Sequence, residues 1–314
     1  MGKWLTGIAL ALLLLCRPED AANGAREALR QWYFAVAPAL FPFMALLPLL
    51  TSPEGNGACN AALGGLMQRL FGLPGSAAAP VVAGMFAGSP AGCVAAKRVA
   101  IEEGWPRGRL ERVALACCGL SPAFYISAVG AGMLKDAALG HVLLRSQMLS
   151  QLTMLGLTGL FCRSEAPVDA TLKDAAASPV TAIIHVAGTM ALFGAIAGAM
   201  RWPWAHLMLE VTAGTRLLCG LDLDMPRKLA ALSALTAWGG ACACAQNIGA
   251  LKGCGIHPAK FVAARCAAGL LAAGFTLLDR MAFPAYPPKA FAMSCVLALL
   301  MAAPAILRLK RTIF

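Results

Sequence analysis

The stretch that decides the fold is SAAAPVVAGMFAGSPAGCVAA, residues 76–96, with Gly88-Ser89-Pro90-Ala91-Gly92 near the middle of an otherwise apolar run. Ser is a favoured N-cap residue, and Pro is favoured at the first position of a helix. The pattern therefore predicts a membrane segment that is interrupted here, with a half-helix beginning at Ser89. The first N–H groups of that half-helix would lack intrahelical partners and would form a positive end suited to an anion. A proline kink packed against a neighbouring helix is the alternative interpretation.

The composition of the whole chain indicates a membrane protein. Of its 314 residues, 59% are hydrophobic and only 13% are charged, and the mean hydropathy is +0.71. A soluble protein has about 45–50% apolar and about 25% charged residues, so this chain has too little charge to cover a soluble surface. We therefore expect a polytopic integral membrane protein. It should be all-α, because lipid-exposed loops and open sheet edges do not occur within hydrocarbon.

Apolar runs predict about nine to eleven membrane segments. Residues 4–16 resemble the core of a signal peptide, but no A-x-A-like cleavage site follows directly, so an uncleaved first helix is favoured. Residues 52–75 are expected to form a Gly-rich connection with a modest amphipathic piece around Met67–Phe71, and residues 97–112 a charged loop. The remaining expected spans are 31–50, 76–96, 114–134, 138–162, 179–200, 203–221, 229–251, 258–278 and 289–307.

This layout predicts four parts: a membrane anchor helix over 1–30, a first half over 31–162, a polar linker over 163–178 and a second half over 179–314. Each half has a helix, an apolar segment broken by small residues, a short basic loop and another span. Paired interrupted segments at corresponding positions are typical of transporters built from inverted repeats. Trp238-Gly239-Gly240, followed by Gln246, is the expected counterpart of the Gly88 cluster.

The charged residues and cysteines exclude several other functions. The net charge is +11, but most basic residues lie in short loops, which favours a topological role over nucleic-acid binding. The twelve cysteines lie mainly inside apolar runs, with no C-x-x-C and no zinc-type spacing, so we expect packing residues and neither a metal nor a cofactor. The P-loop, H-E-x-x-H and G-x-S-x-G motifs are absent, and we expect no enzyme activity.

Polar residues inside apolar spans complete the candidate solute site. Ser121-Pro122 repeats the cap-and-proline pattern and predicts a second helix start within the membrane. An ionised Glu210 at the bilayer centre costs at least about 2.5–3.5 kcal/mol, so it should be protonated, paired or facing water. Glu210, which Thr212 follows closely, is expected either to couple transport to protons or ions or to anchor hydrogen bonds.

Arg145, in the other half of the chain, is a candidate basic partner for Glu210. With His141, Gln147 and Gln151 it gives residues 138–162 a polar side, which either lines a cavity or lies in a helix interface. Glu210 and Arg145 should in either case face protein or water.

The ordered motifs resemble one known family. Ala37-Pro38-Ala39-Leu40-Phe41-Pro42-Phe43, Leu73-Pro74-Gly75 and Gly88-Ser89-Pro90-Ala91-Gly92 are followed by residues 117–124, 209–214 and Gly239-Gly240 with Gln246. This set, over roughly residues 30–300, is similar to the YlbJ-type sporulation integral membrane proteins, which are related to the nucleoside-recognition or Gate-domain group. The chain departs from the family where Cys118-Gly119 replaces an Asn-Asn pair.

The resemblance implies a transporter in the cytoplasmic membrane of endospore-forming bacteria, at the outer forespore membrane. The implied solute is dipicolinate, a small aromatic dicarboxylate. Alternatives are a nucleoside or metal-ion permease, and a structural sporulation protein that transports nothing. The expected partners are a small anionic solute and the lipid bilayer, with a homo-oligomer or other sporulation membrane proteins as further candidates.

Overall fold

The computed structural model describes residues 2–168 and 179–282, and within them every regular element is a helix. The all-α class is therefore confirmed. Four helical stretches are long and apolar enough to cross a membrane: Pro18–Leu50, Val180–Met200, Met225–Ala250 and Pro258–Asp279. The span predicted at 289–307 lies outside the described residues, as do residues 169–178 of the polar linker.

The chain begins with two helices that meet at Arg17. Helix α1 spans Gly2–Cys16, and α2 spans Pro18–Gln31 with its proline in the first turn. A π-helical turn, η1 (Trp32–Val36), joins α2 to α3 (Ala37–Leu50) without a break. The helix therefore runs through the boundary predicted at residue 30, and α2 is continuous with the first predicted half.

Glycines let α2 pack closely on α10 (Pro179–Met200). A Cβ on Gly24 would lie 2.2 Å from the carbonyl oxygen of Gly194 and 3.2 Å from the Cα of Gly198. Small residues permit such backbone approach between membrane helices. The N-terminal helices are thereby attached to the second half of the chain.

The rest of the first half is also more helical than the sequence predicted. Its elements are α4 (Pro53–Leu66), η2 (Met67–Phe71), η3 (Gly75–Ala77), α5 (Ala78–Phe86), α6 (Ala91–Glu102), α7 (Arg107–Ala116), η4 (Phe124–Leu134), α8 (Ala137–Leu157) and η5 (Thr158–Leu160). The prediction of a connection at 52–75 is wrong, because Ser52 caps Gly55 and Pro53 starts α4 despite its glycines. The loop predicted at 97–112 shrinks to the four residues between α6 and α7.

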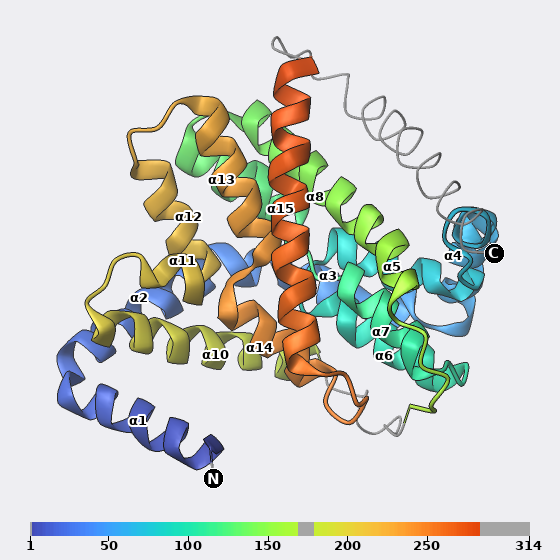
Figure 1. Ribbon diagram of the computed structural model, residues 1–314, viewed down its shortest axis with the longest axis horizontal. Coiled ribbons are helices and arrows are strands. Elements are labelled where there is room, and N and C mark those ends of the chain that lie inside the picture. Colours follow the sequence, from blue (N-terminus) through green and yellow to red (C-terminus); the bar gives the residue numbers. More distant parts are fainter. Residues whose placement is uncertain (1, 169–178, 283–314) are drawn as a thin grey trace.

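The second half follows a similar order. After α10 come α11 (Ala205–Leu209), α12 (Val211–Gly220), α13 (Met225–Trp238), α14 (Gly240–Ala250) and α15 (Pro258–Ala282). Figure 1 shows α15 as a long rod near the middle of the view, with α12 and α13 on one side and α5, α6 and α7 on the other. Helix α15 packs on both α8 and α13.

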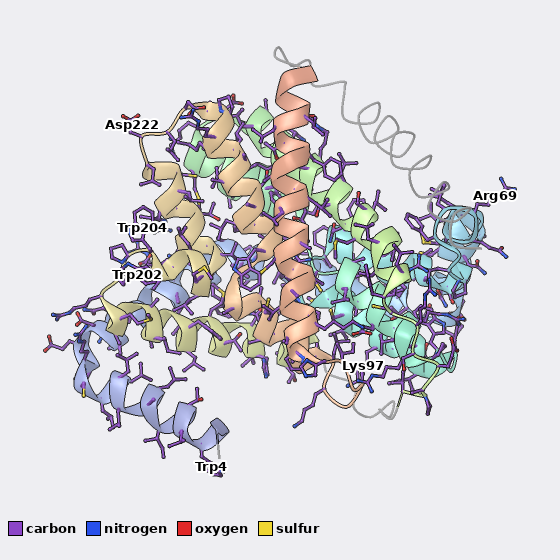
Figure 2. The ribbon with its side chains drawn as sticks, in the orientation of Figure 1. Trp4, Arg69, Lys97, Trp202, Trp204 and Asp222 are labelled. Atoms are coloured by element: carbon purple, nitrogen blue, oxygen red, sulfur yellow. The ribbon has the colours of Figure 1, made fainter. Side chains whose placement is uncertain are left out.

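Large apolar side chains cover the outside of several helices. Leu270 on α15 is 75% exposed, and Leu49 and Ile184 are also exposed. Trp202 and Trp204, which Figure 2 shows together at one edge of the molecule, are exposed between α10 and α11. Exposed Leu and Ile suit lipid tails, and tryptophans favour the membrane–water interface.

Candidate solute site at the helix breaks

Four pairs of helices are separated by a short break. The break between α5 and α6 contains Gly88, and that between α13 and α14 lies at Gly239, so both interruptions predicted from the sequence are confirmed. Residues 117–121 separate α7 from the helical turn that leads into η4, and Glu210 alone separates α11 from α12. Their depth in the membrane stays a prediction.

The breaks meet in pairs within each half. The N–H of Ser89 donates to the carbonyl of Gly119 at 2.7 Å, and a Cβ on Gly88 would lie 2.9 Å from the nitrogen of Ser121. In the second half, a Cβ on Gly240 would lie 3.1 Å from the carbonyl oxygen of Leu209. Gly88 and Gly240 have φ values of +78° and +79°, which glycine adopts without steric cost.

The order of elements changes one expected correspondence. In each half the first broken helix is followed by a short loop, a second broken helix and a long helix. The Gly88 break therefore corresponds in order to the Glu210 break, and the 117–121 break corresponds to Gly239. The pairing of Gly88 with Gly239 inferred from the sequence does not match this order.

Residues of three breaks line one cavity of about 50 Å³, and α14, which begins after the fourth break, completes its wall. The amide nitrogen of Asn247 on α14 donates to the hydroxyl of Ser89 at 2.6 Å, which joins the two halves directly. The lining is mostly apolar with a few polar side chains: Val36, Ala39, Leu40, Ser89, Leu120, Ser121, Phe124, Val186, Met190, Glu210, Val211, Thr212, Cys242, Ala243 and Gln246. A mostly apolar cavity with a few placed polar groups is typical of small-molecule sites.

Ser89 does not cap the helix that follows it. Helix α6 begins at Ala91 after Pro90, and no side chain caps it. The prediction of a half-helix starting at Ser89 is wrong in this detail, because the Ser89 hydroxyl is turned toward Asn247 on the other half. That hydroxyl serves as an acceptor there, so its own hydrogen can be donated into the cavity.

Ser121 caps the helical turn that follows it, as the sequence predicted. Its hydroxyl accepts from the N–H of Phe124 at 3.4 Å, and Pro122 starts the helical turn. The Ser121 hydrogen is also free to point into the cavity. Two hydroxyl donors from the two breaks of the first half therefore lie on the same lining.

Glu210 caps α12 with both carboxylate oxygens. One oxygen accepts from the N–H of Thr212 at 2.9 Å and the other from the N–H of Ala213 at 2.7 Å. Its side chain is 3% exposed, so the expectation that it faces protein is confirmed. A carboxylate at a helix N-terminus is stabilised by the helix dipole, so Glu210 needs no basic partner.

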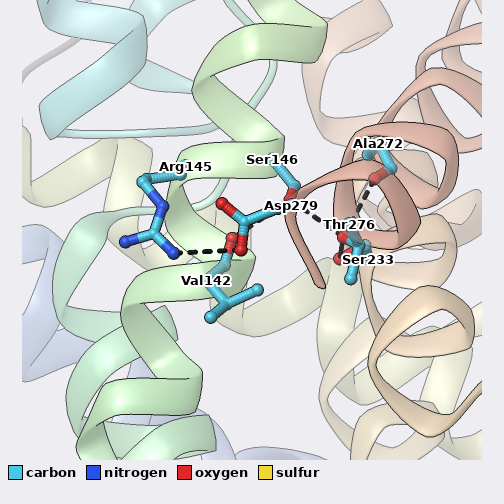
Figure 3. Close-up of polar contacts among 7 residues, drawn as sticks. All are labelled: Val142, Arg145, Ser146, Ser233, Ala272, Thr276 and Asp279. Carbon is cyan, nitrogen blue, oxygen red and sulfur yellow. Dashed lines mark hydrogen bonds and ion pairs between the residues drawn. The ribbon is translucent and has the colours of Figure 1, made fainter. Parts of the chain in front are cut away.

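Arg145 is not the partner of Glu210. It is buried on α8 and pairs with Asp279 on α15 at 3.2 Å (Figure 3), and it does not line the cavity. The candidate pairing of Arg145 with Glu210 is therefore not formed. Asp279 follows the predicted span 258–278, so nothing in the sequence indicated this pairing. Beside this pair, Thr276 donates to Ser146 at 2.9 Å and shares a hydrogen bond with Ser233.

Of the other predicted site residues, Thr212 and Gln246 line the cavity and most of the rest lie outside the lining. Gly92 packs against the backbone of Cys117, where a Cβ would lie 2.4 Å from the carbonyl oxygen. Ala91 and Gly239 are buried, Pro122 is half-buried, and none of the three lines the cavity. Gln246 does line it and donates to Thr189 on α10 at 2.9 Å.

A second cavity of about 160 Å³ adjoins the first. Val186 and Gln246 line both, and Lys97, Pro90 and His185 line the second cavity. Lys97, labelled in Figure 2, is buried, and its ammonium donates to the carbonyl of Lys252 at 2.9 Å. The second cavity therefore places a basic residue next to the central one.

The sequence also missed the apolar walls of the site. Val36 and Leu40 come from η1 and α3, and Val186 and Met190 come from α10. Apolar residues in apolar helices carry no pattern that separates a cavity wall from ordinary packing. Within the described residues, no group of three or more His, Cys, Asp or Glu side chains could hold a metal.

Comparison with known proteins finds a relative among the membrane proteins of sporulation. The chain is 24% identical to the sporulation integral membrane protein YlbJ of Bacillus subtilis strain 168, over 329 aligned positions covering 86% of this chain and 80% of the relative. The resemblance to YlbJ-type proteins is confirmed. The chain is a homologue of an integral membrane protein of sporulation, and it is itself an integral membrane protein. No family model matches, and no solved structure matches.

Proposed function

We propose that this protein transports a small anionic solute across the membrane during sporulation, and that the solute is dipicolinate. The observation that carries the proposal is the meeting of three helix breaks at one cavity, where Ser89, Ser121 and Glu210 line it. Broken helices at a central cavity are the usual setting of solute sites in secondary transporters. The proposal assigns no catalytic step and no cofactor to the chain.

The lining suits a planar ring with polar ends. Leu40, Phe124, Val186 and Met190 provide apolar walls for the ring. The hydroxyls of Ser89 and Ser121 can each donate to a carboxylate. A carboxylate can thus be held by hydroxyl donors with no full positive charge in the central lining, which favours release.

Glu210 has a supporting role in this proposal. Its carboxylate already occupies the N-terminus of α12, so that helix end is closed to a solute anion. Its negative charge keeps the solute carboxylates off this part of the cavity and so orients the solute. In the proposal, the carboxylates lie toward Ser89 and Ser121, and losing Glu210 loses this orientation.

The cavity must widen to admit the solute. A volume of about 50 Å³ holds a few water molecules, which is too little for a ring bearing two carboxylates. We therefore assign this structure to a closed state. Movement at the helix breaks is expected to open the cavity alternately to each side.

The test is uptake of dipicolinate into liposomes that contain only this protein, with the Glu210→Gln variant beside the wild type. The wild type should accumulate dipicolinate. In Glu210→Gln, the amide NH₂ group cannot accept a hydrogen bond, so one of the N–H groups of Thr212 and Ala213 loses its acceptor. The loss of such a charge-assisted hydrogen bond costs about 1.5–3 kcal/mol. We expect uptake to fall about 10- to 100-fold while the protein still inserts.

Glu54→Gln is the matched control, since Glu54 lies in the first turn of the exposed helix α4. Its uptake should equal that of the wild type. A structural protein would show no uptake in any sample, and a permease of another class would take up a nucleoside or a metal ion in place of dipicolinate. Either result would refute the proposed solute.

A further inference from the structure

Three buried side chains at the contact between α8 and α15 have polar hydrogens without an acceptor. They are Arg265 on α15 and Gln147 and Gln151 on α8, all at most 3% exposed. Nη1 of Arg265 and Nε2 of both glutamines have no hydrogen-bond partner. Buried polar groups are nearly always hydrogen-bonded, so three unsatisfied donors in one region call for an explanation.

The contact between the two helices brings these side chains to one place. The hydroxyl of Ser150 on α8 donates to the carbonyl of Ala268 on α15 at 2.7 Å. Arg265 lies three residues before Ala268, so it shares that face of α15. Gln147 and Gln151 are four residues apart and share a face of α8 next to Ser150.

The two glutamines converge on the break at residues 117–121. A Cβ placed on Gly119 would lie 2.4 Å from Nε2 of Gln151 and 3.0 Å from Nε2 of Gln147. The oxygen of Gln147 accepts from the hydroxyl of Tyr125 at 3.0 Å, which turns its NH₂ group toward Gly119. Arg265 lies within electrostatic range of Cys118 in the same break and of Tyr125.

Arg265 has a positive charge without a carboxylate to balance it. Its recorded hydrogen bond is to the carbonyl of Ala237 at the end of α13, and in the described part of the chain no carboxylate forms an ion pair with it. A buried unpaired charge costs several kcal/mol. The unsatisfied atoms here are all donors, so only a ligand that accepts hydrogen bonds can satisfy them.

We propose that Arg265, Gln147 and Gln151 bind a singly charged anion behind the 117–121 break. The ligand is a halide or one carboxylate of a larger solute, because a guanidinium and two amide NH₂ groups match either. This site is separate from the central cavity, which Leu120 and Ser121 of the same break line from another side. The inference does not rest on the proposed transport, since it follows from the charge and donor balance alone.

Thermal unfolding of the purified protein in detergent tests this site, with a buffer free of added salt compared with the same buffer containing sodium chloride. A third sample contains dipicolinate in place of chloride. An anion that binds the folded state stabilises it, and we expect the Tm to rise by about 2–4 °C. A rise with chloride identifies a free halide, and a rise with dipicolinate alone identifies a solute carboxylate.

Three variants locate the effect. The double variant Gln147→Leu/Gln151→Leu removes the amide donors at similar volume, and Arg265→Lys keeps the charge but removes the planar guanidinium. Both should lose most of the anion-dependent shift. Arg216→Gln is the control, because Arg216 forms an exposed pair with Glu27 and should keep the full shift. An equal Tm for the wild type in all three solutions would overturn the proposal, as would an unchanged shift in both site variants.

Discussion

Asp279→Ala is expected to destabilise the protein by about 3–5 kcal/mol, because removing one member of a largely buried ion pair takes away the charge that balances the other. Arg145 is 3% exposed, and its guanidinium lies 3.2 Å from the Asp279 carboxylate. The pair also lies beside the chain of hydroxyls that links α8, α13 and α15 through Thr276 (Figure 3). Unfolding in detergent, followed by helix content, would measure the loss.

Two comparisons separate charge from packing in that result. Replacing both partners, as Arg145→Met with Asp279→Leu, should restore most of the stability, since apolar substitutes for a buried pair are often neutral or better. Asp20→Ala breaks an exposed pair with Arg201 and should cost less than about 1 kcal/mol. If Asp279→Ala behaves like Asp20→Ala, the pair does not support the fold.

Gly92→Ala is expected to separate the two breaks of the first half. The added Cβ would lie 2.4 Å from the carbonyl oxygen of Cys117 and 2.6 Å from the Cα of Gly84. The Cβ would meet backbone atoms of both Cys117 and Gly84, which cannot yield as a flexible side chain can. We therefore expect the free energy of unfolding to fall by about 1–3 kcal/mol or more. Solute uptake should be lost as well, because the contact between Ser89 and Gly119 depends on this spacing.

Gly57→Ala is the matched substitution. Gly57 is exposed on α4, and no atom lies within 4 Å of its Cβ position. Alanine should there stabilise the helix by about 0.5–1 kcal/mol. Equal thermal stability of the Gly92 and Gly57 variants would show that the breaks do not need this close contact.

The interruptions at Gly88 and Gly239 could be predicted because glycine and proline act on the backbone locally. The same holds for the cap at Ser121, which needs only the next three residues. The break at Glu210 has no glycine or proline of its own. It shows in the sequence only as a lone acid in an apolar run, which predicts a functional residue and leaves its geometry open.

Pairings between distant helices could not be predicted. Ser89 has a favourable capping sequence, but its hydroxyl accepts a hydrogen bond from the amide of Asn247, which is 158 residues away in the sequence. The chain contains several acidic residues that could pair with Arg145. The packing of α8 against α15 brings Asp279 to it. Residues 52–75 differ from these cases, because the local start signal Ser52-Pro53-Glu54 outweighs the low helix propensity of the glycines that follow.

The central claim is that the solute passes through the cavity at the helix breaks, and filling that cavity tests it most directly. Ala243 lines it, and Ala243→Trp would occupy the space between the walls. Leu270→Trp places the same side chain on an exposed position of α15. In liposomes that hold equal amounts of inserted protein, we predict that dipicolinate uptake by Ala243→Trp falls below about one tenth of the wild-type rate, the tenfold loss that about 1.4 kcal/mol produces, while Leu270→Trp keeps that rate. Uptake by Ala243→Trp at the wild-type rate would contradict the account.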